Sequence, residues 1–332
     1  MAQTVLVTGG TGFIAGWCIV HLLERGHAVR TTVRDLTKEQ RVRAAAGAAN
    51  SDRLTVVVAD LNDDRGWDAA VAGCDYVLHV ASPLGGGTTT DRNALIAPAR
   101  DGTLRVLRAA AKAGVKRVVM TSAAAAARPP LTSQRASDET VWSDPDDPQF
   151  DAYRVSKILA ERAAWDFVRA AGKETLLTTI LPGAVFGPIR DAENLGSVQI
   201  IQGLLRGRPG ALPRLGFWIV DVRDLADLHV RAMTAESAAG QRFIAAGEFM
   251  WMEDMAKTLR AQLGAAGAKI STRRLPDFVV RLLLPFMANL RSLAPLLGRR
   301  FPLNTDKARQ VLGFTPRPVA MTLVECARSL VD

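Results

Sequence analysis

The first half of the chain alternates between short runs of β-branched and other apolar residues and longer segments whose apolar positions have helical spacing. The apolar runs predict strands at Thr4–Gly9, Ala28–Val33, Leu54–Asp60, Tyr76–Ala81, Arg117–Ser122 and Thr175–Leu181. Helical segments separate them, the first from Gly12 to Arg25. Because strands that alternate with helices pair in parallel through right-handed crossovers, this pattern predicts a doubly wound α/β sheet covered on both faces.

The pattern is less regular in the second half. The stretch FWIVDVRDLADLHVRAM predicts a short strand running into a helix, RFIAA predicts another strand, and the rest to Asp332 is mostly helical. We therefore predict a Rossmann-type, dinucleotide-binding domain over residues 1–181. Residues 182–332 are predicted to form mainly a smaller, mostly helical C-terminal substrate lobe, with some segments returning to the first domain.

The apolar stretch Phe278–Gly298 is interrupted by arginine, proline and asparagine. We expect core or lobe helices there and no integral membrane association. A peripheral membrane surface is the alternative.

Composition fits a folded α/β protein and narrows the partners. The 332 residues are 48% hydrophobic and 23% charged, which excludes long disorder. The net charge of +9 would suit nucleic acid, but aromatic residues make up only 6% and no Lys/Arg block interleaves with them. We predict no nucleic-acid partner, and an arginine-rich surface that attracts anionic ligands.

Cysteines, histidines and the N-terminus point to a reducing compartment and no metal. Cys18, Cys74 and Cys326 lie far apart without metal or redox spacing, and the four histidines form no ligand pattern. The start, MAQTVLVTGG, enters a strand at once and does not resemble a signal peptide. A cytoplasmic location and no catalytic metal are expected.

A glycine-rich turn directly follows the first strand in VTGGTGFIAGW, where Gly9, Gly12 and Ala15 fall at three-residue spacing. Such a turn lets backbone N–H groups approach a pyrophosphate at a helix N-terminus. A plain strand-to-helix turn is the alternative. The predicted nucleotide contacts here are Gly9, Thr11, Gly12, Phe13 and Ile14.

The ends of the next strands predict which nucleotide binds. In this fold an Asp or Glu at the end of strand two holds the ribose hydroxyl of NAD, whereas Arg accepts the phosphate of NADP. Here Arg34 precedes Asp35, which favours NADP(H); a solvated surface pair is the alternative. Asp60 is placed to meet the adenine, or else caps a helix. Leu61, Val80, Ala81 and Ser82 complete the predicted contacts of these strand ends.

Tyr153 and Lys157 lie four residues apart in the helical segment DAYRVSKILAERAAW, and so on one helix face. The lysine ammonium and a positive nicotinamide ring would favour the phenolate and lower the pKa of Tyr153 from its usual value near 10. Tyr153 is then a proton donor for catalysis. An incidental surface pair is the alternative.

Together these motifs resemble the extended short-chain dehydrogenases/reductases. TGGTGFIA, HVASP, MTS, DETVW, YRVSK, LPGAVFGP and VDVRDLA occur in the order of that family, and the resemblance extends to TDKARQVLGFTPRP near the end. TVRD, DETVWSD and LAERAAWDF are similar to the branch of dihydroflavonol reductases, cinnamoyl-CoA reductases and microbial NADPH-dependent aldehyde and ketone reductases.

The resemblance implies a catalytic Ser-Tyr-Lys set. Tyr153 would donate the proton, Lys157 would lower the pKa of Tyr153 and bind the nicotinamide ribose, and a serine at the edge of strand five would polarise the carbonyl. NADPH would deliver the hydride. The resemblance also places Pro182, Gly183 and Val185 beside the nicotinamide, although a strand-end turn explains this segment equally.

The serine is the point of departure from the family. Relatives commonly show Thr-Ser-Ser at this edge, with the second serine catalytic, whereas this chain has Thr121, Ser122 and Ala123. Either Ser122 takes the role through a one-residue shift, or Thr121 does, or the hydroxyl is missing at a cost on the order of a hundredfold in rate. Our prediction is Ser122.

The predicted function is an NADPH-dependent carbonyl reductase acting on small aldehydes or ketones with apolar or aromatic groups. The alternatives are a nucleotide-sugar epimerase or dehydratase, with Arg206, Arg208 and Arg214 near an anionic diphosphate, and a non-catalytic NADP(H)-binding sensor. The segment 82–91 is predicted to be a mobile loop over the substrate. Phe186, Phe217 and Trp218 line an apolar pocket or belong to the core. Monomer and homodimer are both compatible with the sequence.

Overall fold

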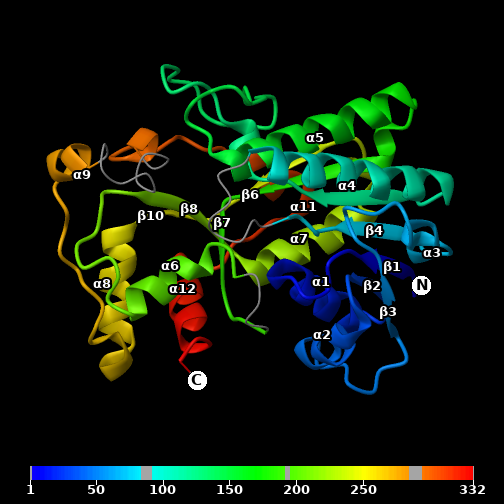
Figure 1. The fold of residues 1–332 in the computed structure, drawn as a ribbon, viewed down its shortest axis with the longest axis horizontal. Helices are drawn as coiled ribbons and strands as arrows, with labels where there is room; N and C mark the ends of the chain where they lie inside the picture. The colour runs from blue at the N-terminus through cyan, green and yellow to red at the C-terminus, as the bar shows by residue number, and fades with distance from the viewer. Residues whose placement is uncertain (1, 84–91, 191–194, 284–293, 332) are drawn as a thin grey trace.

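The computed structural model describes residues 2–83, 92–190, 195–283 and 294–331. Its main sheet has seven parallel strands in the order β3-β2-β1-β4-β5-β6-β9 (Figure 1). The strands are β1 Thr4–Val7, β2 Ala28–Val33, β3 Leu54–Val58, β4 Tyr76–His79, β5 Arg117–Thr121, β6 Leu177–Pro182 and β9 Arg242–Ala245. The predicted doubly wound sheet is confirmed, and its order reverses between β1 and β4, where such folds open a ligand crevice.

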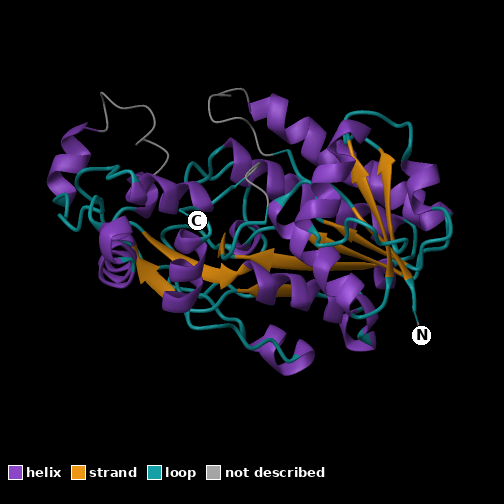
Figure 2. Ribbon diagram, turned by 90° about the horizontal axis from the view of Figure 1, so that it is seen from below, coloured by secondary structure: helices purple, strands orange, loops and turns teal. Residues whose placement is uncertain are grey.

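Helices cover both faces of this sheet (Figure 2). One face carries α1 Phe13–Glu24, α2 Glu39–Ala45, α7 Val222–Thr234 and α11 Asp306–Leu312; the other carries α3 Trp67–Val71, α4 Arg92–Lys112 and α5 Ala152–Ala170. Alternation along β1 explains the two layers. Val5 and Val7 pack into the first core, and Leu6 packs into the second.

The C-terminal lobe has its own small sheet, in the order β10-β8-β7. Its elements are β7 Ala184–Phe186, β8 Gly216–Asp221, β10 Phe249–Trp251, α6 Val198–Leu205, α8 Met252–Gln262, α9 Asp277–Leu283 and α12 Val319–Arg328. The predicted strand and helix in FWIVDVRDLADLHVRAM are β8 and α7, and RFIAA contains β9, which returns to the main sheet. We did not predict β7 and β10, because three residues are too few for an apolar alternation to be recognised.

Short 3₁₀ turns occupy several connections. They are η1 Leu36–Lys38, η2 Ala124–Ala127, η3 Glu174–Leu176, η4 Glu236–Ala238, η5 Gly264–Gly267 and η6 Ala294–Leu296. The strand predicted from Thr175 begins later, at Leu177, because η3 precedes it. Strands β1, β3 and β4 each end two residues before the predicted end. The residues beyond those ends form loops at the carboxyl edge of the sheet, where the crevice lies.

Helix α5 presents Tyr153 and Lys157 from a well-defined start. The Asp151 side chain caps the helix by accepting a hydrogen bond from the Arg154 N–H at 2.8 Å. Its apolar side chains pack inward against the sheet and against η2. The alanines Ala125–Ala127 are therefore buried, and their small side chains let η2 lie close to α5.

Two predictions fall largely outside the described residues. Of the predicted mobile loop 82–91, only Ser82 and Pro83 are described. Of the apolar stretch from Phe278, the structure describes the α9 part and the η6 part. Among the helices of the described ranges, none combines the length and apolar character needed to cross a membrane.

Candidate active site

A cavity of about 1320 Å³ runs along the carboxyl edge of the main sheet and continues onto the lobe. This volume exceeds that of a typical small-molecule pocket, so it has room for a dinucleotide and a substrate together. Every residue predicted to contact the cofactor or to act in catalysis lines it. These are Gly9, Thr11, Gly12, Phe13, Ile14, Arg34, Asp60, Leu61, Val80, Ala81, Ser82, Ser122, Tyr153, Lys157, Pro182, Gly183 and Val185.

The glycine turn requires glycine at its first position. Gly9 has φ +74°, and a Cβ there would come within 3.0 Å of the Ala81 Cβ. The Gly9 N–H donates to the Thr32 hydroxyl at 2.9 Å, which fixes the turn against β2. Gly12 caps α1 without a side-chain hydrogen bond. The N–H groups of the first helical turn therefore keep their capacity to bind an anion, and a pyrophosphate fits this cradle.

The strand-two end presents positive rather than negative charge to the cavity. Arg34 lines it, and so does Lys38, which sequence reasoning missed. Asp35 is not among the lining residues; it accepts a hydrogen bond from the Thr37 N–H at 2.9 Å and caps η1. No carboxylate of this strand end is thus placed to hold a ribose hydroxyl.

Asp60, predicted to meet the adenine, lines the cavity beyond the end of β3, and one of its carboxylate oxygens is already hydrogen-bonded. Its Oδ1 accepts hydrogen bonds from the Asn62 N–H at 2.9 Å and the Asn62 amide at 3.2 Å. The second carboxylate oxygen is left for a ligand or for water.

Lys157 is almost completely buried at the wall of the cavity. Its Nζ donates to the Thr121 carbonyl oxygen at 2.8 Å, and its side chain is only 4% exposed. Burial lowers the pKa of Lys157 to about 8. The positive charge at this position is therefore sensitive to mildly alkaline pH.

Tyr153 faces the cavity from the first turn of α5 and is 37% exposed. This exposure is to the interior of the cavity, and the surrounding walls raise the pKa of the phenol by desolvation. We predicted a lowered pKa. The direction is the opposite here, because desolvation is the largest influence and Lys157 directs its ammonium at Thr121. A positive nicotinamide ring bound beside the phenol would lower that pKa.

The Thr121 hydroxyl already donates a hydrogen bond within the protein. The His229 Nδ1 lies 2.8 Å from the Leu225 carbonyl oxygen and must donate to it. Burial lowers the pKa of His229 to about 4, so the ring is neutral and its Nε2 accepts from the Thr121 hydroxyl at 2.7 Å.

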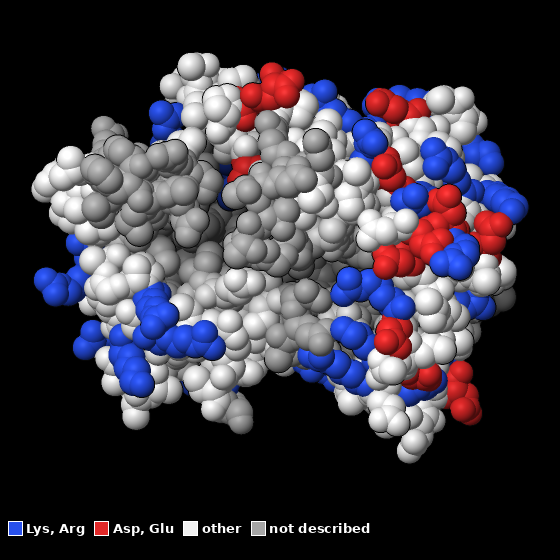
Figure 3. Space-filling view, viewed as in Figure 1, with Lys and Arg blue, Asp and Glu red and all other residues white. Residues whose placement is uncertain are grey.

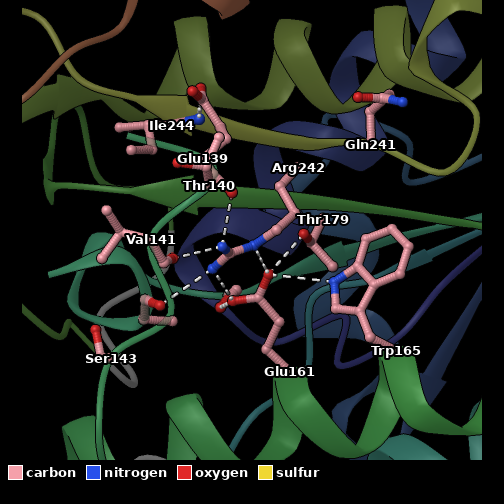
Figure 4. A network of polar contacts seen from close by, with 12 residues as sticks. Glu139, Thr140, Val141, Ser143, Glu161, Trp165, Thr179, Gln241, Arg242 and Ile244 are labelled. Carbon is pink, nitrogen blue, oxygen red and sulfur yellow. Dashed lines mark hydrogen bonds and ion pairs between the residues drawn. The ribbon is translucent and has the colours of Figure 1, made fainter. Parts of the chain in front are cut away.

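The Ser122 hydroxyl also donates a hydrogen bond within the protein, to the Glu161 carboxylate at 2.6 Å. Glu161 also accepts from Thr179 at 2.7 Å and from the Arg242 Nε at 2.9 Å (Figure 4). Ser122 is thereby part of a buried polar cluster, although it also lines the cavity. This hydrogen bond weighs against Ser122 as the group that polarises a carbonyl, because it directs the hydroxyl proton into the protein. Ser122 as the polarising group stays a prediction.

Ala123 occupies the position where a hydroxyl would reach the cavity. It lines the cavity, is half-buried, and has extended backbone angles that any residue adopts. Of the three alternatives left open by the sequence, the arrangement of Thr121 and Ser122 favours the missing hydroxyl.

At the lobe end of the cavity, the structure distinguishes pocket-lining residues from core residues, a distinction that the sequence left open. Phe217 and Trp218 line it, whereas Phe186 is fully buried in the lobe core. None of Arg206, Arg208 and Arg214, the arginines considered for a diphosphate, lines the cavity.

Three further arginines line the cavity, and sequence reasoning missed them: Arg128, Arg154 and Arg299. The place of Arg128, as the first charged residue after the strand-five edge, was the one available signal.

A cluster suited to a metal is absent from the described part of the chain, where no group of three or more His, Cys, Asp or Glu side chains is placed to hold an ion.

A family model described as the NAD dependent epimerase/dehydratase family matches residues 5–246. The chain belongs to this family. Its relatives include cinnamoyl-CoA reductase 2 of Arabidopsis thaliana, 40% identical over 250 residues, which are 73% of this chain and 73% of that protein. Ketoreductase azaE of Aspergillus niger is 32% identical over 352 residues, covering 100% of this chain and 98% of that protein.

Solved structures agree with this assignment. Yeast methylglyoxal/isovaleraldehyde reductase Gre2 complexed with NADPH superposes with a TM-score of 0.82 at 25% identity, covering 99% of this chain and 98% of that chain. An epimerase of Methanothermobacter thermautotrophicus shares the fold with a TM-score of 0.79 at 18% identity, so the fold alone does not separate reductase from epimerase. The sequence relatives confirm the predicted resemblance: the chain is an oxidoreductase of the extended short-chain dehydrogenase/reductase type, in the reductase branch.

Proposed function

We propose that this protein is an NADPH-dependent carbonyl reductase that reduces an aldehyde or ketone, with Tyr153 as the proton donor. The observation that carries the proposal is a single cavity that joins the glycine turn, Arg34 and the Tyr153–Lys157 pair. Relatives named as cinnamoyl-CoA reductase and ketoreductase support the same chemistry.

The preference for NADPH rests on charge at the strand-two end. Arg34 and Lys38 both line the cavity, while Asp35 is engaged in capping η1. A guanidinium and an ammonium bind a ribose phosphate, whereas a hydroxyl would need the carboxylate that is missing here. When bound, NADPH supplies the hydride that is transferred to the carbonyl carbon.

Tyr153 supplies the proton to the oxygen of the same carbonyl. Because desolvation raises the pKa of its phenol, Tyr153 is protonated at neutral pH and available as a general acid. Lys157 is positioned by its hydrogen bond to the Thr121 carbonyl oxygen. Its ammonium lines the cavity and binds the hydroxyls of the nicotinamide ribose. We further propose that no hydroxyl of the β5 edge assists, because those of Thr121 and Ser122 donate to His229 and Glu161.

The test is the loss of NADPH absorbance with a panel of aromatic and aliphatic aldehydes, ketones and ketoesters, run in parallel with NADH. We expect turnover of several carbonyls with a clear preference for NADPH. NADPH binding without turnover of any carbonyl would overturn the reductase proposal in favour of a sensor. A sugar nucleotide converted without net consumption of NADPH would favour the epimerase alternative.

A further inference from the structure

Arg128 stands on the cavity wall directly after η2, and its position is tightly determined. Its backbone N–H donates to the Ser143 hydroxyl at 2.7 Å. Its guanidinium carbon lies 4.6 Å from the ring centroid of Phe301 and 5.9 Å from that of Phe150. Contacts with two aromatic rings hold the side chain without using its hydrogen bonds.

The guanidinium of Arg128 lacks the partners that a buried charge normally has. Its Nη1 is buried and has no hydrogen-bond partner among the residues that the structure describes. Burial lowers the pKa of Arg128 to about 10, with the nearby Arg154 adding repulsion, so the group is still charged at neutral pH. A buried charged donor is unfavourable unless an acceptor completes it, and a wall position makes a ligand the natural acceptor.

The surrounding wall is positive. Away from the nucleotide end and Lys157, the charged residues that line the cavity are Arg128, Arg154, Arg299 and Asp151. Asp151 is already paired with Arg154, and the Arg299 guanidinium donates to the Leu131 carbonyl oxygen at 3.2 Å. The single carboxylate of this wall is thus paired with Arg154. Asp151 and Asp147 attract the charge of Arg128 from a longer distance, and among the described residues no carboxylate forms an ion pair with it.

The outer surface of the lobe adds to this field. On the face shown in Figure 3, Lys and Arg side chains gather on the side of α6 and α8, although α8 also carries an ion pair between Lys257 and Glu253, whereas both signs intermix over the main domain. Such a distribution draws anions toward the lobe.

We propose that Arg128 binds the carboxylate of the substrate, and that the physiological substrate is an oxo acid. The planar guanidinium matches a carboxylate through two parallel hydrogen bonds, and the singly charged carboxylate balances Arg128 without facing Asp151 as a dianion would. Hydride reaches the carbonyl carbon and the Tyr153 proton reaches its oxygen, so the oxo acid becomes a hydroxy acid with its carboxylate unchanged. This inference rests on the proposed reductase function.

The first experiment compares matched substrates that differ only in the anion. Phenyl-substituted 2-, 3- and 4-oxo acids are assayed beside their primary amides with NADPH. For at least one chain length we expect kcat/KM of the acid to exceed that of the amide about tenfold or more. Arg128→Gln should remove that preference. It should lower kcat/KM for the acid about ten- to a hundredfold and leave kcat/KM for the amide within about twofold of the unaltered protein. Arg128→Lys should retain part of the preference, because lysine keeps the positive charge but cannot form the two parallel hydrogen bonds of a guanidinium.

Arg299→Gln is the matched control. It also removes a guanidinium from this wall, but one that already has a backbone acceptor, the Leu131 carbonyl oxygen. It should change the acid-to-amide ratio far less than Arg128→Gln does. A thermal melt checks folding of Arg128→Gln, and we expect no loss of Tm, since the substitution removes an unpaired charge. Amides turned over as well as acids by the unaltered protein, or an equal effect of Arg128→Gln on both, would overturn the inference while the reductase function stands.

A second measurement does not depend on turnover. Calorimetry with NADP⁺ present measures binding of 4-phenylbutanoate and of its amide. We expect the carboxylate to bind more tightly, by about tenfold, and Arg128→Gln to abolish the difference. If no carbonyl is reduced at all, the proposed function fails. This binding difference then decides by itself whether Arg128 is an anion site.

Discussion

The two ends of the cavity are built in different ways. At the predicted nucleotide end, the lining residues come from the carboxyl ends of strands of one parallel sheet and from the segments that follow them, such as the turn at Gly9 and the β2 end at Arg34. At the substrate end, the wall combines segments far apart in the chain, such as Arg128, Trp218 and Phe301. The first end is set by regular backbone geometry and the second by the packing of the lobe, so substitutions at the two ends should have separable effects.

The Tyr153–Lys157 pair stands between the two ends and should show the largest effect. Tyr153→Phe removes the proton donor, so kcat should fall by about 10² to 10⁴ while the Kd of NADPH stays within a few-fold. Stopped-flow or steady-state kinetics together with cofactor titration by fluorescence measure both. Retention of more than a tenth of kcat would mean that another group donates the proton.

A substitution at the nucleotide end should change the cofactor and spare the carbonyl. Arg34→Leu removes a phosphate-binding cation, so kcat/KM for NADPH should fall about ten- to a hundredfold, with that for NADH nearly unchanged. The ratio of the two cofactors at fixed carbonyl concentration is the measurement. A matched control is Arg41→Leu, on the neighbouring α2 and outside the cavity lining, which should leave the ratio as it is.

The β5 edge offers a pair of adjacent substitutions with opposite expectations. Ala123→Ser places a hydroxyl on the cavity wall and should raise kcat by about tenfold, since a well-placed donor of this kind is worth up to a hundredfold or more. Ser122→Ala removes a buried hydrogen bond to Glu161, so it should lower the free energy of unfolding by about 1–3 kcal/mol and leave kcat of the folded enzyme within about threefold. Kinetics and urea unfolding of both variants test this. A large loss of kcat in Ser122→Ala would restore Ser122 as the polarising group.

The pH dependence should be the smallest effect and follows from Lys157. Its pKa of about 8 means that the ammonium is lost as pH rises through that value, so kcat/KM should decline above pH 8. Tyr153, with a raised pKa, keeps its proton over the same range. The stability effect has the opposite sign: between pH 8 and about 10.5 the unfolded chain binds the Lys157 proton more strongly than the folded one, so this group's contribution to stability rises with pH. Rate profiles and melts from pH 6 to 10 separate the two, and a flat rate profile would contradict the role of Lys157.

Prediction from sequence succeeded where a residue's position follows from its place along one element. Strand ends at Val7 and Val33 put Gly9 and Arg34 at one edge of the sheet, because parallel strands share their carboxyl ends. The four-residue spacing of Tyr153 and Lys157 likewise requires only a helix. Spacing along a helix did not reveal that desolvation raises the pKa of Tyr153, because desolvation depends on how much wall surrounds the phenol. The lowering of that pKa by a bound nicotinamide ring stays a prediction.

The doubly wound sheet, the glycine turn and the Tyr153–Lys157 pair could be predicted from the sequence, since each follows from periodicity and from strand and helix ends. The acceptors of the Thr121 and Ser122 hydroxyls became known only from the folded structure. Their partners, His229 and Glu161, lie 108 and 39 residues away in the chain. The folded structure also decided that the Nη1 of Arg128, on the cavity wall, finds no acceptor among the described residues. The physical reason is that a hydrogen bond or an unpaired charge depends on which distant groups the packed core brings within about 3 Å, and no local pattern records those distances.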